Sequence, residues 1–160
     1  MIDHFTLKVS DYSRSKPFYV AALKPLGYLV AMEYGGGCGM GVAGKPDLWI
    51  VQDPENTRPT HFAFHTEDRK AVDAFYGSAM AAGARDNGPP GLRKEYHPNY
   101  YAAFVLDPDG HNVEAVCHAP PRAPKPRARA GQRRLSAAKP RGSGVKARTG
   151  TRRPARRARR

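Results

Sequence analysis

Apolar and polar residues alternate along residues 2–9, a pattern typical of a strand with one buried face. Phe5, Leu7 and Val9 share one side of this segment, and His4 lies on the other. We expect the apolar side to face the core. His4 is therefore predicted to point away from the core.

A helical pattern follows over residues 11–26, where apolar positions recur every three or four residues. Residues 11–13 offer capping side chains, Pro17 falls near the first turn, where it costs little, and Gly27 is a helix terminator. Strand-like apolar runs come next, at residues 28–33, 38–42 and 47–52. The first part of the chain is thus predicted to be a βαβββ unit.

The same order begins again after a polar, proline-containing linker at residues 53–59. The pattern predicts a strand at 61–64, a helix at 68–82 that ends before Gly83, and strands at 84–87, 100–106 and 111–117. The two halves align at a shift of 57, with six identical pairs: His4/His61, Phe5/Phe62, Asp11/Asp68, Phe18/Phe75, Tyr19/Tyr76 and Ala22/Ala79. In the last strand the shift becomes 65, which aligns Trp49 with Glu114. We infer one supersecondary unit used twice.

Residues 104–118 read as a strand, a turn and a second strand. The Asp-Pro-Asp-Gly segment at 107–110 suits a type I turn. After the turn, Val113 and Ala115 fall on one face and Glu114 on the other. Glu is disfavoured in the middle of a strand. Glu114 is therefore expected to face water or to have a function.

The charge of the chain is divided very unevenly. Residues 119–160 contain 16 of the 27 Lys and Arg residues and no acidic residue, whereas residues 1–118 combine 11 basic with 14 acidic residues. Residues 1–118 suffice for one domain, with modules at about 1–53 and 60–118. The basic tail has too few large apolar residues to offset its ordering entropy and is predicted to be disordered. It would bind nucleic acid non-specifically or be a dispensable extension.

The sequence favours a cytoplasmic protein. No apolar run approaches the ~20 residues that a bilayer span requires, and no signal peptide precedes the first strand. The two cysteines, Cys38 and Cys117, lie in strand-like runs and do not form a disulfide framework.

Two histidines and one carboxylate are candidate metal ligands. His4 and His61 occupy equivalent positions in the two units, and Glu114 has the same parity on the last strand. If each unit forms a curved sheet with its helix outside, the three side chains point into one concavity. This donor set suits Fe(II), Zn(II), Mn(II) or Ni(II). The remaining strand histidines are expected to be solvated or hydrogen-bonded: His65, His111 and His118.

These features resemble the vicinal oxygen chelate superfamily, which includes glyoxalase I, extradiol dioxygenases, fosfomycin-resistance thiol transferases and bleomycin-binding proteins. The resemblance covers residues 1–118 and rests on IDHFTLKVSD (2–11), THFAF (60–64) and FVLDPDGHNVEAV (104–116). It implies an α+β fold in which two βαβββ modules form a cupped mixed sheet with helices outside, often across a homodimer interface. It also implies a divalent metal ion on His4, His61 and Glu114.

The chain departs from glyoxalase I at Trp49, where that enzyme is expected to carry a ligating Glu. An indole offers a metal no lone pair, so glyoxalase I activity is not expected. Thr6 and the LWIV segment at 48–51 resemble the fosfomycin enzymes, whereas Phe104 stands where those enzymes tend to have a Tyr. His97 is the only candidate for the acid–base histidine of the dioxygenases.

The expected function is that of a metal-dependent enzyme that acts on a small oxygen-chelating substrate as a lyase, dioxygenase or thiol transferase. Besides the ligand Glu114, Tyr96 or His97 could move a proton. Residues 88–101 predict a loop that closes one end of the cup. Substrate contacts are predicted from Trp49, Thr6, Arg93, Tyr100, Tyr101 and Phe104. The alternative is a metal-free binding protein that sequesters its ligand, as bleomycin-resistance proteins do.

Overall fold

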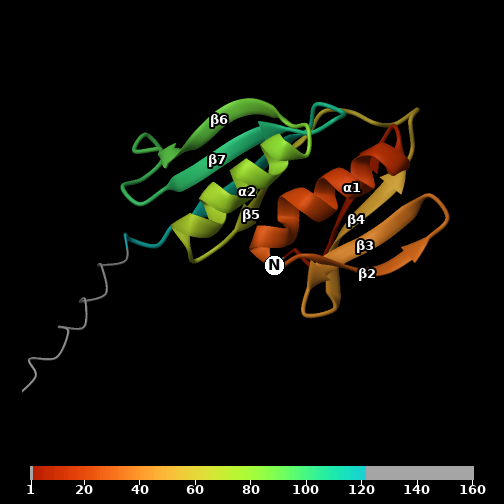
Figure 1. Cartoon of the computed structure of the whole chain (residues 1–160), viewed down its shortest axis with the longest axis horizontal. Helices are drawn as coiled ribbons and strands as arrows, with labels where there is room; N and C mark the ends of the chain where they lie inside the picture. The colour runs from red at the N-terminus through yellow and green to blue at the C-terminus, as the bar shows by residue number, and fades with distance from the viewer. Residues whose placement is uncertain (1, 122–160) are drawn as a thin grey trace, which may run out of the picture. The chain divides into compact units, whose positions relative to one another are not determined.

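The structure is a computed structural model that describes residues 2–121, and within them two modules have the same order of elements (Figure 1). Module 1 consists of β1 (Phe5–Val9), α1 (Tyr12–Leu23), the 3₁₀ turn η1 (Lys24–Leu26), β2 (Leu29–Tyr34), β3 (Gly37–Val42) and β4 (Lys45–Gln52). Module 2 consists of β5 (His61–His65), α2 (Arg69–Ala81), β6 (Arg85–Leu92), β7 (Tyr101–Leu106) and β8 (Asn112–Cys117). The predicted α+β class and the repeated βαβββ unit are confirmed. The predicted basic tail lies, from residue 122 onward, outside the described residues.

Each module builds its own four-stranded mixed sheet. The strand orders are β1-β4-β3-β2 and β5-β8-β7-β6, and in each sheet the first pair is parallel and the others are antiparallel. Thr6 stands opposite Trp49 in module 1, and Ala63 stands opposite Glu114 in module 2. The register therefore confirms that Trp49 and Glu114 occupy equivalent positions.

Both helices begin within one residue of the predicted starts, and α2 ends within one residue of its predicted end, but α1 ends at Leu23 and the 3₁₀ turn η1 takes the chain on to Leu26. The Asp11 side chain caps the first turn of α1, and the Asp68 side chain caps α2. Gly27 and Gly83 follow the helices with φ angles of 85° and 96°, which glycine adopts without strain. Each helix packs on one face of its own sheet, and α1 and α2 lie side by side (Figure 1).

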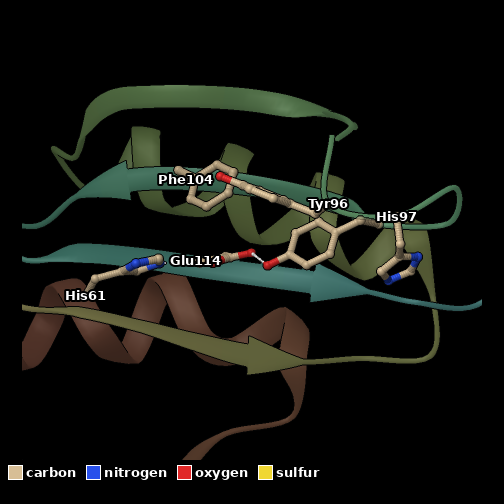
Figure 2. Close-up of a pocket in the computed structure, with 6 residues that line it drawn as sticks. His61, Tyr96, His97, Phe104 and Glu114 are labelled. Atoms are coloured by element: carbon tan, nitrogen blue, oxygen red, sulfur yellow. Dashed lines mark hydrogen bonds and ion pairs between the residues drawn. The ribbon is translucent and has the colours of Figure 1, made fainter. Parts of the chain in front are cut away.

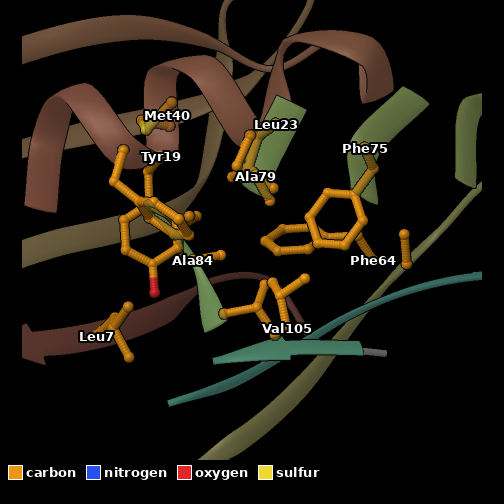
Figure 3. Packing of buried hydrophobic residues seen from close by; sticks show 14 of the residues in the cluster. Leu7, Tyr19, Leu23, Met40, Phe64, Phe75, Ala79, Ala84 and Val105 are labelled. Carbon is orange, nitrogen blue, oxygen red and sulfur yellow. The ribbon is translucent and has the colours of Figure 1, made fainter. Parts of the chain in front are cut away.

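One hydrophobic core is shared by both modules. Figure 3 labels Leu7, Tyr19, Leu23 and Met40 of module 1 beside Phe64, Phe75, Ala79, Ala84 and Val105 of module 2. Val113, Ala115 and Cys117 are also buried, as the alternation along β8 predicts. Phe5 departs from its prediction, because this first residue of β1 is 38% exposed and its ring contacts Phe62, with centroids 5.3 Å apart.

Strand β6 is longer than the sequence predicts. The expected strand stopped at residue 87, but β6 continues through Pro89 and Pro90 to Leu92. Proline is tolerated here because β6 is an edge strand, and its pairing with β7 shifts register on both sides of Gly88. The predicted loop at 88–101 is therefore reduced to residues 93–100.

Both cysteines, Cys38 and Cys117, are buried free thiols, which agrees with the expected lack of a disulfide framework. Between residues 2 and 121, neither helix has the length and apolar character needed to cross a bilayer.

Candidate functional site

His61 and Glu114 meet on the face of the module 2 sheet that points away from α2. They come from the neighbouring parallel strands β5 and β8, and His61 Nε2 lies 2.9 Å from Glu114 Oε2. Both line a cavity of about 370 Å³. Figure 2 shows Glu114 on the sheet with His61 to one side and His97 farther along on the other. The remaining lining residues are Tyr96, Tyr100 and Phe104.

The other carboxylate oxygen of Glu114 is held by Tyr100, whose hydroxyl donates to Oε1 over 2.6 Å. Burial and this hydrogen bond raise the pKa of Tyr100 well above its usual value. The phenol is therefore a protonated donor at neutral pH. Tyr100 belongs to the loop before β7, whereas the resemblance to the fosfomycin enzymes places a Tyr at the position of Phe104. This loop hydroxyl reaches the carboxylate beside the ring of Phe104.

Glu114 is an acid in a buried position, with a relative exposure of 2%. Within residues 2–121 its partners are an imidazole and a phenol, and no Lys or Arg forms an ion pair with it. A buried carboxylate is costly unless it is paired or binds a metal. The side chain of His61 is 52% exposed. The chemistry of this pair fits two ligands of a divalent cation.

His4, the third predicted ligand, lies elsewhere in the single chain. Its Nδ1 is 3.0 Å from Asp3 Oδ1, and its side chain is 57% exposed. His4 lines a second cavity of about 500 Å³, which His61 also borders. Among the described residues of one chain, His4, His61 and Glu114 do not form a group with ligand atoms within 4.8 Å of one another. The structure therefore brings together two of the three predicted ligands.

Arg93 stands at the wall of the site. It lines a neighbouring cavity of about 410 Å³ together with His61 and Tyr96. Its Nη2 donates to the carbonyl oxygen of Pro89 over 2.7 Å, and its guanidinium lies 5.5 Å from the ring centroid of Phe104. The contact between Arg93 and a small molecule stays a prediction.

Three other predicted contact residues do not line the His61–Glu114 cavity of the described chain. Tyr101 points to the opposite face, where its hydroxyl donates to Asp73 of α2 over 2.7 Å, because side chains alternate along β7 and Phe104 takes the cavity side. Thr6 and Trp49 pair on module 1. The indole of Trp49 lies over Gly39, where a Cβ atom would be 3.0 Å from the ring.

His97 lines the cavity, but its hydrogen-bonding partner is another histidine. Its Nε2 lies 2.7 Å from His118 Nδ1. His118 and His65 are exposed, and His65 Nε2 is 3.5 Å from a carboxylate oxygen of Glu67. These two strand histidines are solvated or hydrogen-bonded, as predicted, and the contact between His97 and His118 was not foreseen.

A second cluster of metal-ligating side chains consists of Asp107, Asp109 and His111, whose ligand atoms lie within 4.8 Å of one another. These side chains already have hydrogen-bonding partners within the chain. Asp107 accepts hydrogen bonds from the Tyr19 hydroxyl over 2.7 Å and from two backbone amides. The two ring nitrogens of His111 face the backbone oxygen of Lys8 and the backbone amide of residue 60. The group is therefore structural.

We call this group, with its module 1 partners Ser10, Arg14 and Tyr19, the inter-module clasp. Asp109 accepts from the Ser10 backbone amide over 2.9 Å and pairs with Arg14 over 2.6 Å. Burial raises the pKa of Asp107. Burial would also raise the pKa of Asp109, but the hydrogen bonds from Ser10 and the charge of Arg14 lower it below its usual value.

Comparison with known proteins agrees with the fold described above. The sequence profile of the Glyoxalase/Bleomycin resistance protein/Dioxygenase superfamily matches residues 1–115. The uncharacterized protein YqjT of Bacillus subtilis is 34% identical over 131 residues, an alignment that covers 71% of this chain and 95% of YqjT. The metallothiol transferase FosB of Shouchella clausii is 31% identical over 119 residues, covering 71% of this chain and 77% of FosB.

Among solved structures, a glyoxalase/bleomycin resistance protein from Albidiferax ferrireducens has the same fold, with a TM-score of 0.61 and 24% identity. The match covers 72% of this chain and 96% of that protein. The chain belongs to the Glyoxalase/Bleomycin resistance protein/Dioxygenase superfamily. Proteins of this superfamily commonly form dimers, bind small molecules and often use divalent metal ions.

Proposed function

We propose that the protein is a divalent-metal-dependent enzyme that acts on a small oxygen-chelating substrate. The observation that carries the proposal is the buried carboxylate of Glu114, which touches His61 and has no Lys or Arg partner among the described residues. Of the three reaction types expected from the sequence, the thiol-transferase type has the most support, because FosB, a metallothiol transferase, is 31% identical.

The ligands in this proposal are His61 and Glu114 of one chain and His4 of a second copy. The exposure of His4 supports a shared site. So do the large apolar side chains that the single chain leaves exposed near it and on β2: Ile2, Leu29, Met32 and Tyr34. Exposed apolar surface often marks an interaction surface, and a homodimer would cover such side chains. The same assembly would bring Thr6 and Trp49 toward the substrate.

The cation would supply Lewis acidity toward substrate oxygens, and its identity among Fe, Mn, Zn and Ni is left open. The chain supplies the remaining functions. Tyr100 holds Glu114 through its hydroxyl, and Arg93 and Phe104 shape the adjoining wall. Tyr96 and His97 border the cavity and are the candidates for proton transfer.

Metal analysis of the purified protein is the first test, followed by calorimetric titration of Mn²⁺, Ni²⁺ and Zn²⁺ into chelator-treated protein. His61→Ala should lose at least about tenfold in affinity because a ligand is removed. His65→Ala is the matched control, since His65 lies on the same strand and does not line the cavity. Equal affinity of wild type and His61→Ala would reject the proposal.

Mixed dimers test whether the site is shared. A His4→Ala chain retains His61 and Glu114, and a Glu114→Gln chain retains His4. If the ligands come from two copies, refolding the two variants together restores one complete site per mixed dimer. If the ligands come from one chain, every site in the mixture stays incomplete. Metal affinity that does not recover on mixing would overturn the two-chain arrangement.

A metal-free ligand-binding protein is the second candidate. It is favoured by the hydrogen-bonding partners that the chain itself gives the Glu114 carboxylate, His61 and Tyr100. Thermal-shift screening of small diols, thiols and α-keto compounds, in chelator and in metal, separates the two functions. Stabilisation by a ligand that is indifferent to metal would favour the binding protein.

Three proposals from the sequence are also retained: a cytoplasmic location, a domain at residues 1–118, and a tail that contacts nucleic acid non-specifically or is dispensable. Deletion of residues 121–160 is expected to leave metal affinity unchanged. A loss of affinity on deletion would show that the tail takes part in the site.

A further inference from the structure

The loop at residues 93–100 is attached to the end of β8 by the two histidines His97 and His118. His97 Nδ1 accepts a hydrogen bond from the backbone amide of Asn99 over 3.1 Å. Neutral His97 therefore carries its proton on Nε2 and donates it to His118 Nδ1, 2.7 Å away. In this hydrogen bond His97 of the loop is the donor, and His118 at the end of β8 is the acceptor.

The same imidazoles surround Tyr100. The ring centroid of His97 lies 5.4 Å and that of His118 5.1 Å from the centroid of Tyr100, at interplanar angles of 75° and 73°. Tyr96 adds a third edge-on contact at 4.9 Å. Such edge-to-face contacts are the favoured geometry of aromatic pairs. The backbone amide of Tyr100 also donates to the carbonyl oxygen of His97 over 3.1 Å.

We propose that the His97–His118 pair is a latch that sets the position of the Tyr100 hydroxyl and, through it, of the Glu114 carboxylate. The inference deepens the proposed metal site and rests on that function. It makes His118 a positioning residue and gives His97 a role besides the proton transfer expected from the sequence. The hydrogen bond from Tyr100 to Glu114, 2.6 Å long, is the link to the site. A hydrogen-bonding partner of a ligating group orients that group.

Three variants isolate the latch. His118→Ala removes the acceptor, whereas His118→Asn keeps a side-chain acceptor near the position of Nδ1. His65→Ala is the matched control, because His65 stacks on His118 with centroids 5.7 Å apart and makes no hydrogen bond to His97. Thermal melts of each variant verify that it is folded.

Amide hydrogen exchange of the full-length, metal-free protein measures directly whether the latch holds the loop in place. The amides of Asn99 and Tyr100 should exchange about threefold to tenfold faster in His118→Ala, since one hydrogen bond is lost. Both amides should exchange at wild-type rates in His118→Asn and His65→Ala. Wild-type exchange in His118→Ala would overturn the latch.

A double-mutant cycle tests whether the latch acts through Tyr100. Tyr100→Phe and His118→Ala should each weaken Mn²⁺ affinity about tenfold, and the double variant should be no weaker than either one. Additive losses would overturn the relay. If wild-type protein binds no metal, the proposed function fails, and the exchange measurement alone decides the latch.

Discussion

The two modules have the same backbone plan and different chemistry in a single row of side chains. The row crosses the sheet on the face away from the helices. In module 1 it contains Thr6, Trp49 and Gly39. In module 2 it contains Ala63, Glu114 and Phe104. The equivalent strands β4 and β8 thus carry an indole in one module and a carboxylate in the other.

The residues on the strands next to β4 and β8 also differ between the modules. Trp49 packs closely on Gly39, because a Cβ atom there would be 3.0 Å from the indole and from Pro46. Glu114 instead stands beside Phe104 and receives the hydroxyl of Tyr100. Register, capping and core packing are shared by the modules, so the backbone alone does not explain why the proposed carboxylate ligand lies in module 2 and not at the equivalent position of module 1. The difference lies in a few side chains of one row.

The largest expected effect is on metal affinity, when the residues at the two equivalent positions are substituted. Glu114→Ala should lower metal affinity at least about 100-fold, since a ligand contributes more than the partners that orient it. Trp49→Ala changes the equivalent position of module 1 and should leave metal affinity within about threefold. Calorimetric titration measures both. Similar losses in the two variants would contradict the assignment of Glu114, and not the equivalent residue of module 1, as a ligand.

Gly39→Ala tests the fit beneath Trp49. The added methyl group meets the indole and Pro46, and crowding of this kind costs about 1–3 kcal/mol of folding free energy. Gly35→Ala is the control, because its Cβ atom would meet no neighbour within 4 Å. Urea denaturation compares the two variants. Equal stability would show that the indole moves aside freely.

Tyr19 of α1 and Tyr76 of α2 occupy equivalent positions in the repeat, so substituting each of them compares the two helices. Tyr19 is fully buried, and its hydroxyl donates to Asp107, whereas Tyr76 is only partly buried. Tyr19→Phe leaves a buried acceptor unpaired and should cost about 1–3 kcal/mol of stability. Tyr76→Phe should cost less than about 0.5 kcal/mol. A smaller effect at Tyr19 than at Tyr76 would contradict the inter-module clasp.

The smallest effect depends on pH. Arg14 pairs with Asp109, and module 2 has Ala71 at the position equivalent to Arg14. Because the pKa of Asp109 is lowered in the folded protein, its stabilisation is complete above its unfolded value of about 3.9 and is lost as the pH falls through the folded pKa. Arg14→Ala should therefore cost about 0.5–1 kcal/mol at pH 7 and less at pH 3.

Urea denaturation at the two pH values measures this difference. A gap between wild type and Arg14→Ala that does not change with pH would show that Arg14 acts through packing alone.

The fold and two of the candidate ligands were predictable from the sequence because they depend on local periodicity. Strand parity places a side chain on one face, and the repeat fixes equivalent positions, so His61 and Glu114 could be assigned to one surface. Parity does not say how two sheets are placed relative to each other. The distance of His4 from Glu114 therefore could not be predicted.

Contacts made by loops and edges were not predictable in the same way. The Gly-Pro-Pro-Gly sequence at 88–91 reads as a loop, yet an edge strand accepts it because only one side must be paired. The hydrogen bonds of Tyr100 and His97 join residues 14 and 21 positions apart. Sequence periodicity does not predict such contacts, because the conformation of the loop decides which side chain reaches the site.

The inter-module clasp has a consequence for how the gene can change. Its acidic residues lie in the turn that leads into β8, and their partners Ser10, Arg14 and Tyr19 lie in the first quarter of the chain. A recombination event that exchanged the first module for that of a related protein would have to bring compatible residues at these three positions. The two modules repeat one unit, but these contacts make them a matched pair that could not be exchanged independently.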